Sequence, residues 1–285
     1  MKKKSGIIGL IFVLLLLTFS SGCTNSRKME IYGGDIVKIH VMHVSSLNSA
    51  LSYELPVIST VEIDDFKIDQ YYVNGEGDYT IEYENITGGN KYRDFYYYFV
   101  HILVDVSDDT PADFSIESVD MFINGEIVNY KIDDMRFTNT KAQYNNWKDD
   151  EDDFVYSSDL TFLYQTIPDE TTQYIYLEAQ SDCVIKDFGA LDYLNIENLE
   201  IYVNNKKVSL GKDIQVYKGD EVKISFNLSY KDNASAESLL KTTRYITYAN
   251  KNGEECVFAD AQGFMVINYI DDAFIKQYID NKLRK

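Results

Sequence analysis

The side chains best suited to hold a metal ion are two histidines and one acidic run. His40 and His43 lie three residues apart in a strand-like segment, DIVKIHVMHV (35–44), so their side chains point to opposite faces of a strand. They therefore cannot ligate one ion together unless a bulge in the strand intervenes. The run 149–153 could offer oxygen ligands to Ca²⁺, and its weak candidate ligands are Asp149, Asp150, Asp152 and Asp153. Because it lacks the spacing and turn glycine of a calcium loop, we interpret it as a solvated acidic loop and expect no metal site.

The sequence contains no catalytic motif that we recognise. A nucleophile elbow, a Walker phosphate loop and a Rossmann glycine pattern are all missing. The 46 acidic residues guarantee many chance carboxylate pairs, so a pair of the kind that glycosidases use carries no information. We therefore expect no catalytic residues, no cofactor and no enzyme activity, with a glycan-active enzyme as the third-ranked function.

Two aromatic residues in a polar stretch are the candidate ligand contacts. Tyr144 and Trp147 lie in QYNNWKDDEDDF (143–154), and Trp147 is the only tryptophan. Exposed aromatic rings offer flat surfaces to sugars or peptides. The same rings could instead pack between two domains, because large aromatic side chains stabilise a fold most when they are buried. Both interpretations stay open at this point.

The N-terminal residues have the composition of an export signal. Lys2, Lys3 and Lys4 precede an uncharged, mostly apolar stretch over 5–19. A basic start, a short apolar core and small residues are typical of a secretory signal peptide. The apolar core is shorter than the about 20 residues of a transmembrane helix, so we expect a cleaved signal rather than an uncleaved anchor.

The small residues before the first cysteine carry a family resemblance. The segment SSGC (20–23) resembles the lipobox of bacterial lipoproteins, with Ser20 where that family usually has leucine. The resemblance covers only the N-terminal segment. It implies that 1–22 are removed and that Cys23 is acylated, by fatty acids such as palmitate, and becomes the first residue of a short tether, 23–32. Two acyl chains would bind firmly to the extracytoplasmic face of the cell membrane, whereas one binds only marginally.

The charge of the chain excludes two classes of partner. Without residues 1–22, the chain has 24 basic and 46 acidic residues, a net charge of about −22. Nucleic acids and anionic lipid surfaces both select a basic protein surface. We therefore expect no nucleic-acid partner, and we expect the lipid on Cys23 to provide the contact with the membrane.

Apolar patterns typical of strands recur along the chain. They lie at 35–44, 95–106, 172–179 and 221–230, each followed by Asn, Gly, Asp or Ser residues. FYYYFVHILVDV (95–106) is apolar on both of its faces, which predicts a central strand covered on both sides with His101 packed in the core. The clearest helical spacing is over 271–285, where acidic residues come first and basic residues last, as the helix dipole favours.

These patterns predict an all-β protein with two antiparallel, immunoglobulin-like β-sandwich domains and a C-terminal α-helix. A mature length of 263 residues suits two domains. The predicted ranges are 1–22 (signal peptide), 23–32 (tether), 33–142 (first sandwich), 143–157 (acidic linker or loop), 158–270 (second sandwich) and 271–285 (helix).

An internal repeat predicts one hairpin in each sandwich. IESVDMFINGEIV (116–128) aligns without gaps to IENLEIYVNNKKV (196–208). Both segments run into a pair of residues that tolerates a tight hairpin turn, at 124–125 and at 204–205. The side chains expected to face the two cores are Val119, Met121 and Ile123 in the first copy and Leu199, Ile201 and Val203 in the second.

The remaining cysteines and the overall function are less constrained. Cys183 and Cys256 could form a disulfide in an exported protein or could be two buried thiols. The leading functional hypothesis is a membrane-anchored lipoprotein with a non-enzymatic role at the cell envelope, which binds a protein or glycan or has a structural role. The alternative is a solute-binding lipoprotein of a transporter, although such proteins usually carry alternating strands and helices that this sequence lacks.

Overall fold

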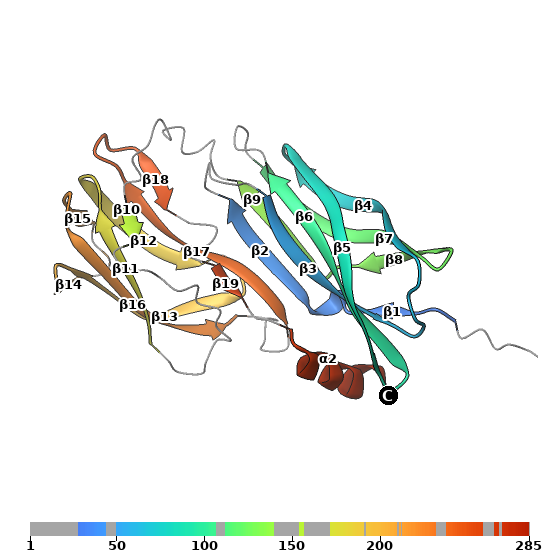
Figure 1. Ribbon diagram of the computed structural model, residues 1–285. Helices are drawn as coiled ribbons and strands as arrows, with labels where there is room; N and C mark the ends of the chain where they lie inside the picture. Colours follow the sequence, from blue (N-terminus) through green and yellow to red (C-terminus); the bar gives the residue numbers. More distant parts are fainter. Residues whose placement is uncertain are drawn as a thin grey trace, which may run out of the picture.

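The computed structural model describes residues 28–43, 50–106, 112–139, 154–156, 172–190, 192–209, 211, 213–231, 238–258, 265–267 and 270–284. Within these ranges the chain is mostly β-strand, in largely antiparallel sheets, with a short helix near the C-terminus (Figure 1). The prediction of a β-rich fold with a C-terminal helix is confirmed at this level. No helix in the described ranges is long and apolar enough to cross a membrane.

Nineteen strands are described, together with three short helical segments. The strands are β1 (Ile31–Tyr32), β2 (Val37–His43), β3 (Ala50–Ser59), β4 (Phe66–Glu76), β5 (Tyr79–Tyr92), β6 (Phe95–Val106), β7 (Ala112–Ile123), β8 (Glu126–Lys131), β9 (Asp134–Asn139), β10 (Phe154–Tyr156), β11 (Gln173–Ala179), β12 (Cys183–Ala190), β13 (Leu194–Val203), β14 (Lys206–Val208), β15 (Ile214–Val216), β16 (Glu221–Tyr230), β17 (Leu239–Ala249), β18 (Glu255–Phe258) and β19 (Met265–Ile267). The helical segments are η1 (Gly34–Ile36), α2 (Asp272–Tyr278) and η3 (Ile279–Leu283).

The strands form three sheets. A four-stranded sheet has the order β1-β3-β6-β5, and a five-stranded sheet has the order β10-β11-β16-β13-β14. The largest sheet has the order β15-β12-β17-β2-β9-β7-β4, with β8, β18 and β19 paired beside this path. Two hydrophobic clusters are buried among these sheets. The first is built mainly from strands β2 to β9, with Leu239 of β17 and the C-terminal helix, and the second is built from strands β11 to β18.

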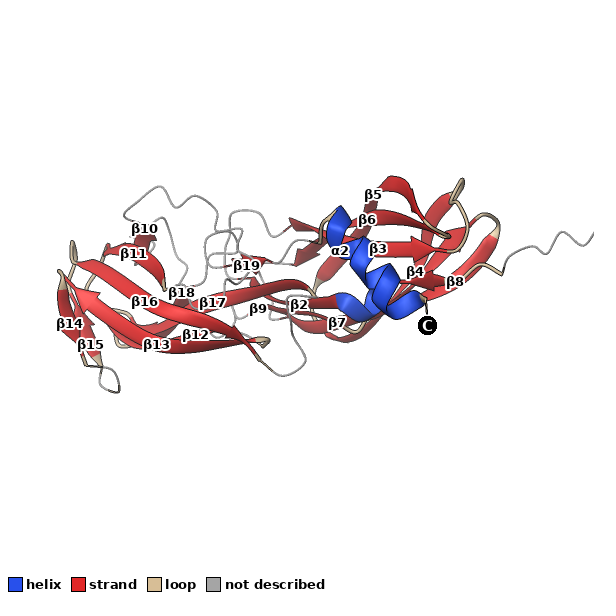
Figure 2. Cartoon of the chain, turned by 90° about the horizontal axis from the view of Figure 1, so that it is seen from below, coloured by secondary structure: helices blue, strands red, loops and turns tan. Residues whose placement is uncertain are grey.

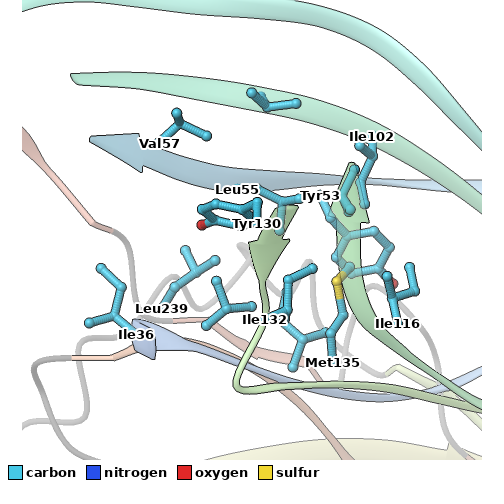
Figure 3. Packing of buried hydrophobic residues seen from close by; sticks show 14 of the residues in the cluster. Ile36, Tyr53, Leu55, Val57, Ile102, Ile116, Tyr130, Ile132, Met135 and Leu239 are labelled. Atoms are coloured by element: carbon cyan, nitrogen blue, oxygen red, sulfur yellow. The ribbon is translucent and has the colours of Figure 1, made fainter. Parts of the chain in front are cut away.

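The first cluster lies between the four-stranded sheet and one half of the largest sheet. Figure 3 shows Leu55 and Val57 of β3 on one side of it and Met135 of β9 on the other. In β6 every second side chain from Val100 to Val106 is buried, whereas the alternate ones are half-buried on the outer face. The prediction that this strand is covered on both faces is therefore wrong. His101 lies on the outer face, 3.0 Å from the Thr87 hydroxyl, and not in the core.

Both predicted hairpins are present, in different sheets. β7 and β8 pair across Asn124 and Gly125, whose φ angles are 50° and 92°. β13 and β14 pair across Asn204 and Asn205, with φ angles of 48° and 62°. Two successive positive φ angles are the requirement of a type I′ turn. The core-facing residues are confirmed: Val119, Met121 and Ile123 belong to the first cluster, and Ile201, with the half-buried Leu199 and Val203, packs in the second.

One long strand belongs to both halves of the molecule. Residues Leu239–Thr242 of β17 pair in parallel with β2, and the following residues Arg244–Ala249 pair with β12. Leu239 is buried in the first cluster, while Leu240 and Ile246 are buried in the second. Because backbone hydrogen bonds run from β12 through β17 to β2, the largest sheet joins the two clusters (Figure 2).

The C-terminal helix packs on the first cluster. Its N-cap Asp271 accepts a hydrogen bond from the backbone nitrogen of Phe274 at 2.8 Å, and its buried face consists of Ile275, Tyr278 and Ile279. The first cluster therefore contains residues from both ends of the described chain.

The two described cysteines do not form a disulfide. Cys183 of β12 is buried, Cys256 of β18 is half-buried, and both are thiols. The sequence was compatible with a disulfide or with two thiols, and the structure shows two thiols.

Candidate functional site

Most of the sequence-predicted site residues lie outside the described ranges. This is true of the lipidation residue Cys23, of the aromatic candidates Tyr144 and Trp147, and of the acidic candidates Asp149, Asp150, Asp152 and Asp153. In the part of the chain that the structure describes, no group of three or more His, Cys, Asp or Glu side chains is placed to hold a metal ion. Candidate sites in the described ranges are therefore formed by residues other than those that the sequence predicted.

The outer face of the five-stranded sheet carries a group of aromatic side chains. In β11 the odd-numbered residues are buried against the second cluster and the even-numbered ones are exposed, so Tyr174 and Tyr176 point outward. Tyr174 is 43% exposed and Tyr176 is 40% exposed. Lone exposed tyrosines are common on protein surfaces, but two on one strand that meet a third across the sheet form a contiguous patch.

The strand register brings the other members of this group together. Tyr176 of β11 is paired with Lys223 of β16, and Lys223 is paired with Tyr202 of β13. One row of side chains thus crosses three strands in the order tyrosine, lysine, tyrosine. We call Tyr174, Tyr176, Tyr202 and Lys223 the tyrosine face.

The lysine holds these rings together by cation–π contacts. Its ammonium nitrogen lies 4.4 Å from the ring centre of Tyr174 and 5.6 Å from those of both Tyr176 and Tyr202. The rings of Tyr174 and Tyr176 are 6.4 Å apart and inclined by 27°. Cations within about 6 Å of an aromatic ring centre are attracted to its electron-rich face. One lysine therefore orders three rings on an open surface.

An ion pair borders the tyrosine face. The Tyr202 hydroxyl donates to Glu200 Oε2 at 2.6 Å, and Lys207 of β14 pairs with the other carboxylate oxygen. The hydrogen bonds from Lys207 and Tyr202 hold the pKa of Glu200 below its usual value, while the bond to Glu200 raises the pKa of Tyr202. The carboxylate is therefore ionised and its charge is balanced locally.

The tyrosine face carries groups that can bind a ligand. Within the described ranges, neither the hydroxyl of Tyr174 nor that of Tyr176 hydrogen-bonds to a protein group, and Lys223 has no carboxylate partner within ion-pair distance. These three groups can donate hydrogen bonds to a ligand, and the rings offer apolar area beside them.

A second polar cluster joins the two halves of the molecule. The Asp192 carboxylate, in the turn before β13, accepts from Arg136 at 2.6 Å and lies 3.1 Å from His40 Nδ1. Arg136 also donates twice to Asp134, at 2.9 and 3.1 Å, and Thr242 donates to the Asp192 carbonyl at 3.2 Å. These contacts connect the turn before β13 to β2, β9 and β17.

The protonation states in this cluster follow from its surroundings. His40 is 8% exposed, and burial together with the Arg136 charge lowers its pKa despite the nearby Asp192 and Asp134. Burial opposes the ionisation of Asp192, but Arg136 and His40 outweigh it and lower the pKa of this carboxyl group. Because an ionised carboxylate only accepts hydrogen bonds, the neutral imidazole carries its proton on Nδ1. We regard this cluster as structural, because its charged groups pair with one another.

A small cavity beside the C-terminal helix is not a candidate ligand site. It has a volume of about 160 Å³ between α2 and the start of β2. Lys38 and Asp133 in its wall form an ion pair, and the Tyr278 hydroxyl donates to Asp35 at 2.6 Å. Pockets that bind small molecules are usually larger, about 300–1,000 Å³.

Sequence reasoning identified neither of these clusters. The alternation in QYIYLEA (173–179) predicts a strand with its tyrosines outside, and that much could have been inferred. Lys223 joins Tyr176 and Tyr202 only through the pairing of three strands that are distant in sequence. His40 was considered only with His43, because its partner Asp192 lies 152 residues away.

Comparisons with known proteins assign no family. No protein-family model matches the sequence, and no curated protein matches it significantly. Among solved structures, one similar chain is the secreted serine protease VesC from Vibrio cholerae, with 9% identity and a TM-score of 0.21 over 67% of this chain and 49% of the protease. The present chain therefore spans about half the length of that protein.

Two bacterial surface proteins are similarly distant. The collagen-binding domain of RspB from Erysipelothrix rhusiopathiae has 10% identity and a TM-score of 0.22, over 86% of this chain and 93% of that one. The adhesin InvE from Yersinia pseudotuberculosis has 10% identity and a TM-score of 0.19, over 81% and 61%. At these TM-scores none of the three likenesses carries an argument about function.

Proposed function

We propose that this protein is a lipid-anchored, non-enzymatic binding protein of the cell envelope, whose ligand is a protein or a glycan. Acylated Cys23 would hold it on the extracytoplasmic face of the membrane, and the tyrosine face would contact the ligand. The two hydrophobic clusters would be the cores of two immunoglobulin-like sandwich domains. The tyrosine face is the observation that carries the binding role.

The position of the tyrosine face supports this proposal. The first described strand, β1, lies at one end of the molecule, and β11, β13 and β16 lie at the other end (Figures 1 and 2). A tether before β1 would therefore attach the first half to the membrane and direct the tyrosine face away from it. β17 would fix the second half relative to the anchored first half, because it is hydrogen-bonded to β12 in one and to β2 in the other.

The test is retention on envelope material. The chain from residue 24 to 285 is mixed with sedimentable envelope fragments of the source cell, and the bound fraction is measured for the wild type and for Tyr174→Ala/Tyr176→Ala. We expect the double variant to bind at least about tenfold more weakly, a loss of about 1.4 kcal/mol of binding free energy.

The matched control is Tyr72→Ala. Tyr72 of β4 is 40% exposed, like Tyr176, but lies on a different sheet. This variant should bind as the wild type does. Equal binding by the double variant and the wild type would contradict the proposal.

A further inference from the structure

We infer that the tyrosine face binds a neutral polysaccharide, which lies flat across β11, β16 and β13. This inference rests on the proposed function, because it takes the tyrosine face as the ligand-binding surface. It goes further by choosing between the two ligand classes and by specifying the charge of the ligand. Four properties of the face support it: its shape, its hydrogen-bond donors, the balance of positive and negative charge around it, and the presence of charged residues in each of its rows.

The shape of the face fits an extended ligand. The row of Tyr176, Lys223 and Tyr202 crosses three adjacent strands, and strands lie about 4.8 Å apart, so the row is about 10 Å long. Tyr174 stands two residues before Tyr176 on β11 and widens the row. A row of rings on an outer sheet face gives a chain of sugars successive stacking positions, because each sugar ring presents an apolar C–H face to an aromatic ring.

The available donors match sugar hydroxyl groups. The hydroxyls of Tyr174 and Tyr176 and the ammonium group of Lys223 have no hydrogen-bonding protein partner within the described ranges. Sugar hydroxyl and ring oxygens accept such hydrogen bonds. The three cation–π contacts fix the lysine before a ligand arrives, which reduces the conformational entropy lost on binding.

The charges around the face disfavour an acidic polysaccharide. Glu178 of β11 and Glu221 of β16 are paired in the row next to Lys223, and Glu200 on the other side is balanced by Lys207. Lys223 and Lys207, which is paired with Tyr202, are thus two cations beside three carboxylates, on a chain of formal net charge −19. A polyanion would gain little from two lysines that stand beside three carboxylates, and it would be repelled by the rest of the surface.

The distribution of charged residues disfavours a protein ligand. The centres of protein–protein interfaces are depleted of Lys and Glu, because burying these groups is costly. Here each of the three adjacent rows has at least one of them: Glu200 beside Ser225, Lys223 between its tyrosines, and Glu178 with Glu221. A protein partner would have to desolvate all of them, whereas a glycan leaves much of this polar surface hydrated.

Affinity electrophoresis tests the inference with defined probes. The chain from residue 24 to 285, which contains every described residue, is run in native gels that contain a neutral polysaccharide (laminarin, dextran, soluble starch or galactomannan) or an acidic one (alginate or polygalacturonate). We expect retardation by at least one neutral polysaccharide, with an affinity that is the same at low and high salt. Tyr174→Ala/Tyr176→Ala should weaken it at least about tenfold, and Tyr72→Ala should leave it unchanged.

The contradicting outcomes separate this inference from the proposed function. Retardation only by acidic polysaccharides, lost at high salt, would refute a neutral ligand. No retardation by any of the six probes, together with envelope binding that still depends on Tyr174 and Tyr176, would refute a glycan and leave a protein ligand. Envelope binding that does not depend on these tyrosines would refute the proposed function itself. Circular dichroism of each variant checks that the β-structure is retained.

Discussion

Asp192 and Arg136 form a 2.6 Å hydrogen bond between the turn that precedes β13 and strand β9, and so connect the second half of the molecule to the first. The same carboxylate oxygen lies 3.1 Å from Nδ1 of the buried His40. Side-chain contacts here supplement the backbone pairing of β17 with β2. The junction therefore has both a sheet connection and an ionic one.

Removal of the Asp192 carboxylate should destabilise the protein. Asp192→Ala leaves the buried His40 Nδ1 without its acceptor, and a buried unsatisfied group costs about 1–3 kcal/mol. The lost ion pair with Arg136 adds little, because both side chains are more than a third exposed. Urea denaturation should show the loss. Asp213→Ala, which breaks the exposed ion pair with Lys186, is the control and should cost less than about 1 kcal/mol. Equal losses would contradict a special role for Asp192.

The stability of the protein should depend on pH through His40. Its pKa is lowered in the folded state by burial and by Arg136, so below about pH 6.5 the unfolded chain binds a proton that the folded chain does not. The free energy of unfolding should therefore fall as the pH drops from about 6.5 to the pKa of folded His40. Asp192, which faces His40 together with Asp134 and Arg136, stays ionised in this window because its own pKa is lowered.

The comparison with His40→Asn isolates this contribution. Asparagine keeps a donor near Asp192 but does not titrate. Denaturant titrations at successive pH values should give a shallower decline for the variant than for the wild type. Parallel declines would show that other groups cause the dependence.

A buried charge in the first hairpin should unfold the protein. Met121 is fully buried in the first cluster, so Met121→Asp places an unpaired carboxylate in an apolar core and should cost more than about 4 kcal/mol. Ile127, in the other strand of the same hairpin, is 59% exposed, and Ile127→Asp should cost less than about 1 kcal/mol. Thermal unfolding followed by circular dichroism gives both values. A native-like melting temperature for Met121→Asp would contradict the observed packing.

The lipid anchor can be tested at Cys23. Cys23→Ala removes the thiol to which the fatty acids would be attached, so we expect loss of fatty-acid labelling and retention of the signal peptide. Metabolic labelling and the apparent mass on gels measure both. A variant that matures and partitions into the membrane like the wild type would contradict the lipoprotein proposal.

The predictable parts of the fold are those encoded locally. The two hairpins follow from Asn-Gly and Asn-Asn turns and from an alternation of apolar residues that a few neighbouring residues specify. The C-terminal helix follows from its apolar spacing and its acidic first turn. Each of these elements needs no knowledge of a distant partner.

The less predictable parts depend on strand pairing between distant segments. β17 pairs with β2, which lies about 200 residues earlier in the chain. The sequence of β17 has no feature that assigns its two halves to different hydrophobic clusters. The outer face of β6 carries Tyr96, Phe99 and Leu103, and such residues are favoured in strands whether or not a second layer covers them, so the sequence of β6 suggests two covered faces where the structure has one. The tyrosine face likewise requires the register of β11, β16 and β13, which the sequence does not give directly.

The most direct measurement of the central claim is the location of ligand contacts by fluorine NMR. The chain is labelled with 3-fluorotyrosine, and the signals of Tyr72, Tyr174, Tyr176 and Tyr202 are assigned by single Tyr→Phe substitutions. Solubilised envelope ligand, or a polysaccharide that retards the protein, is then added. We predict that the signals of Tyr174, Tyr176 and Tyr202 shift and that the signal of Tyr72 does not. Binding that leaves these three signals unchanged would show that the ligand contacts another surface and would contradict the proposal.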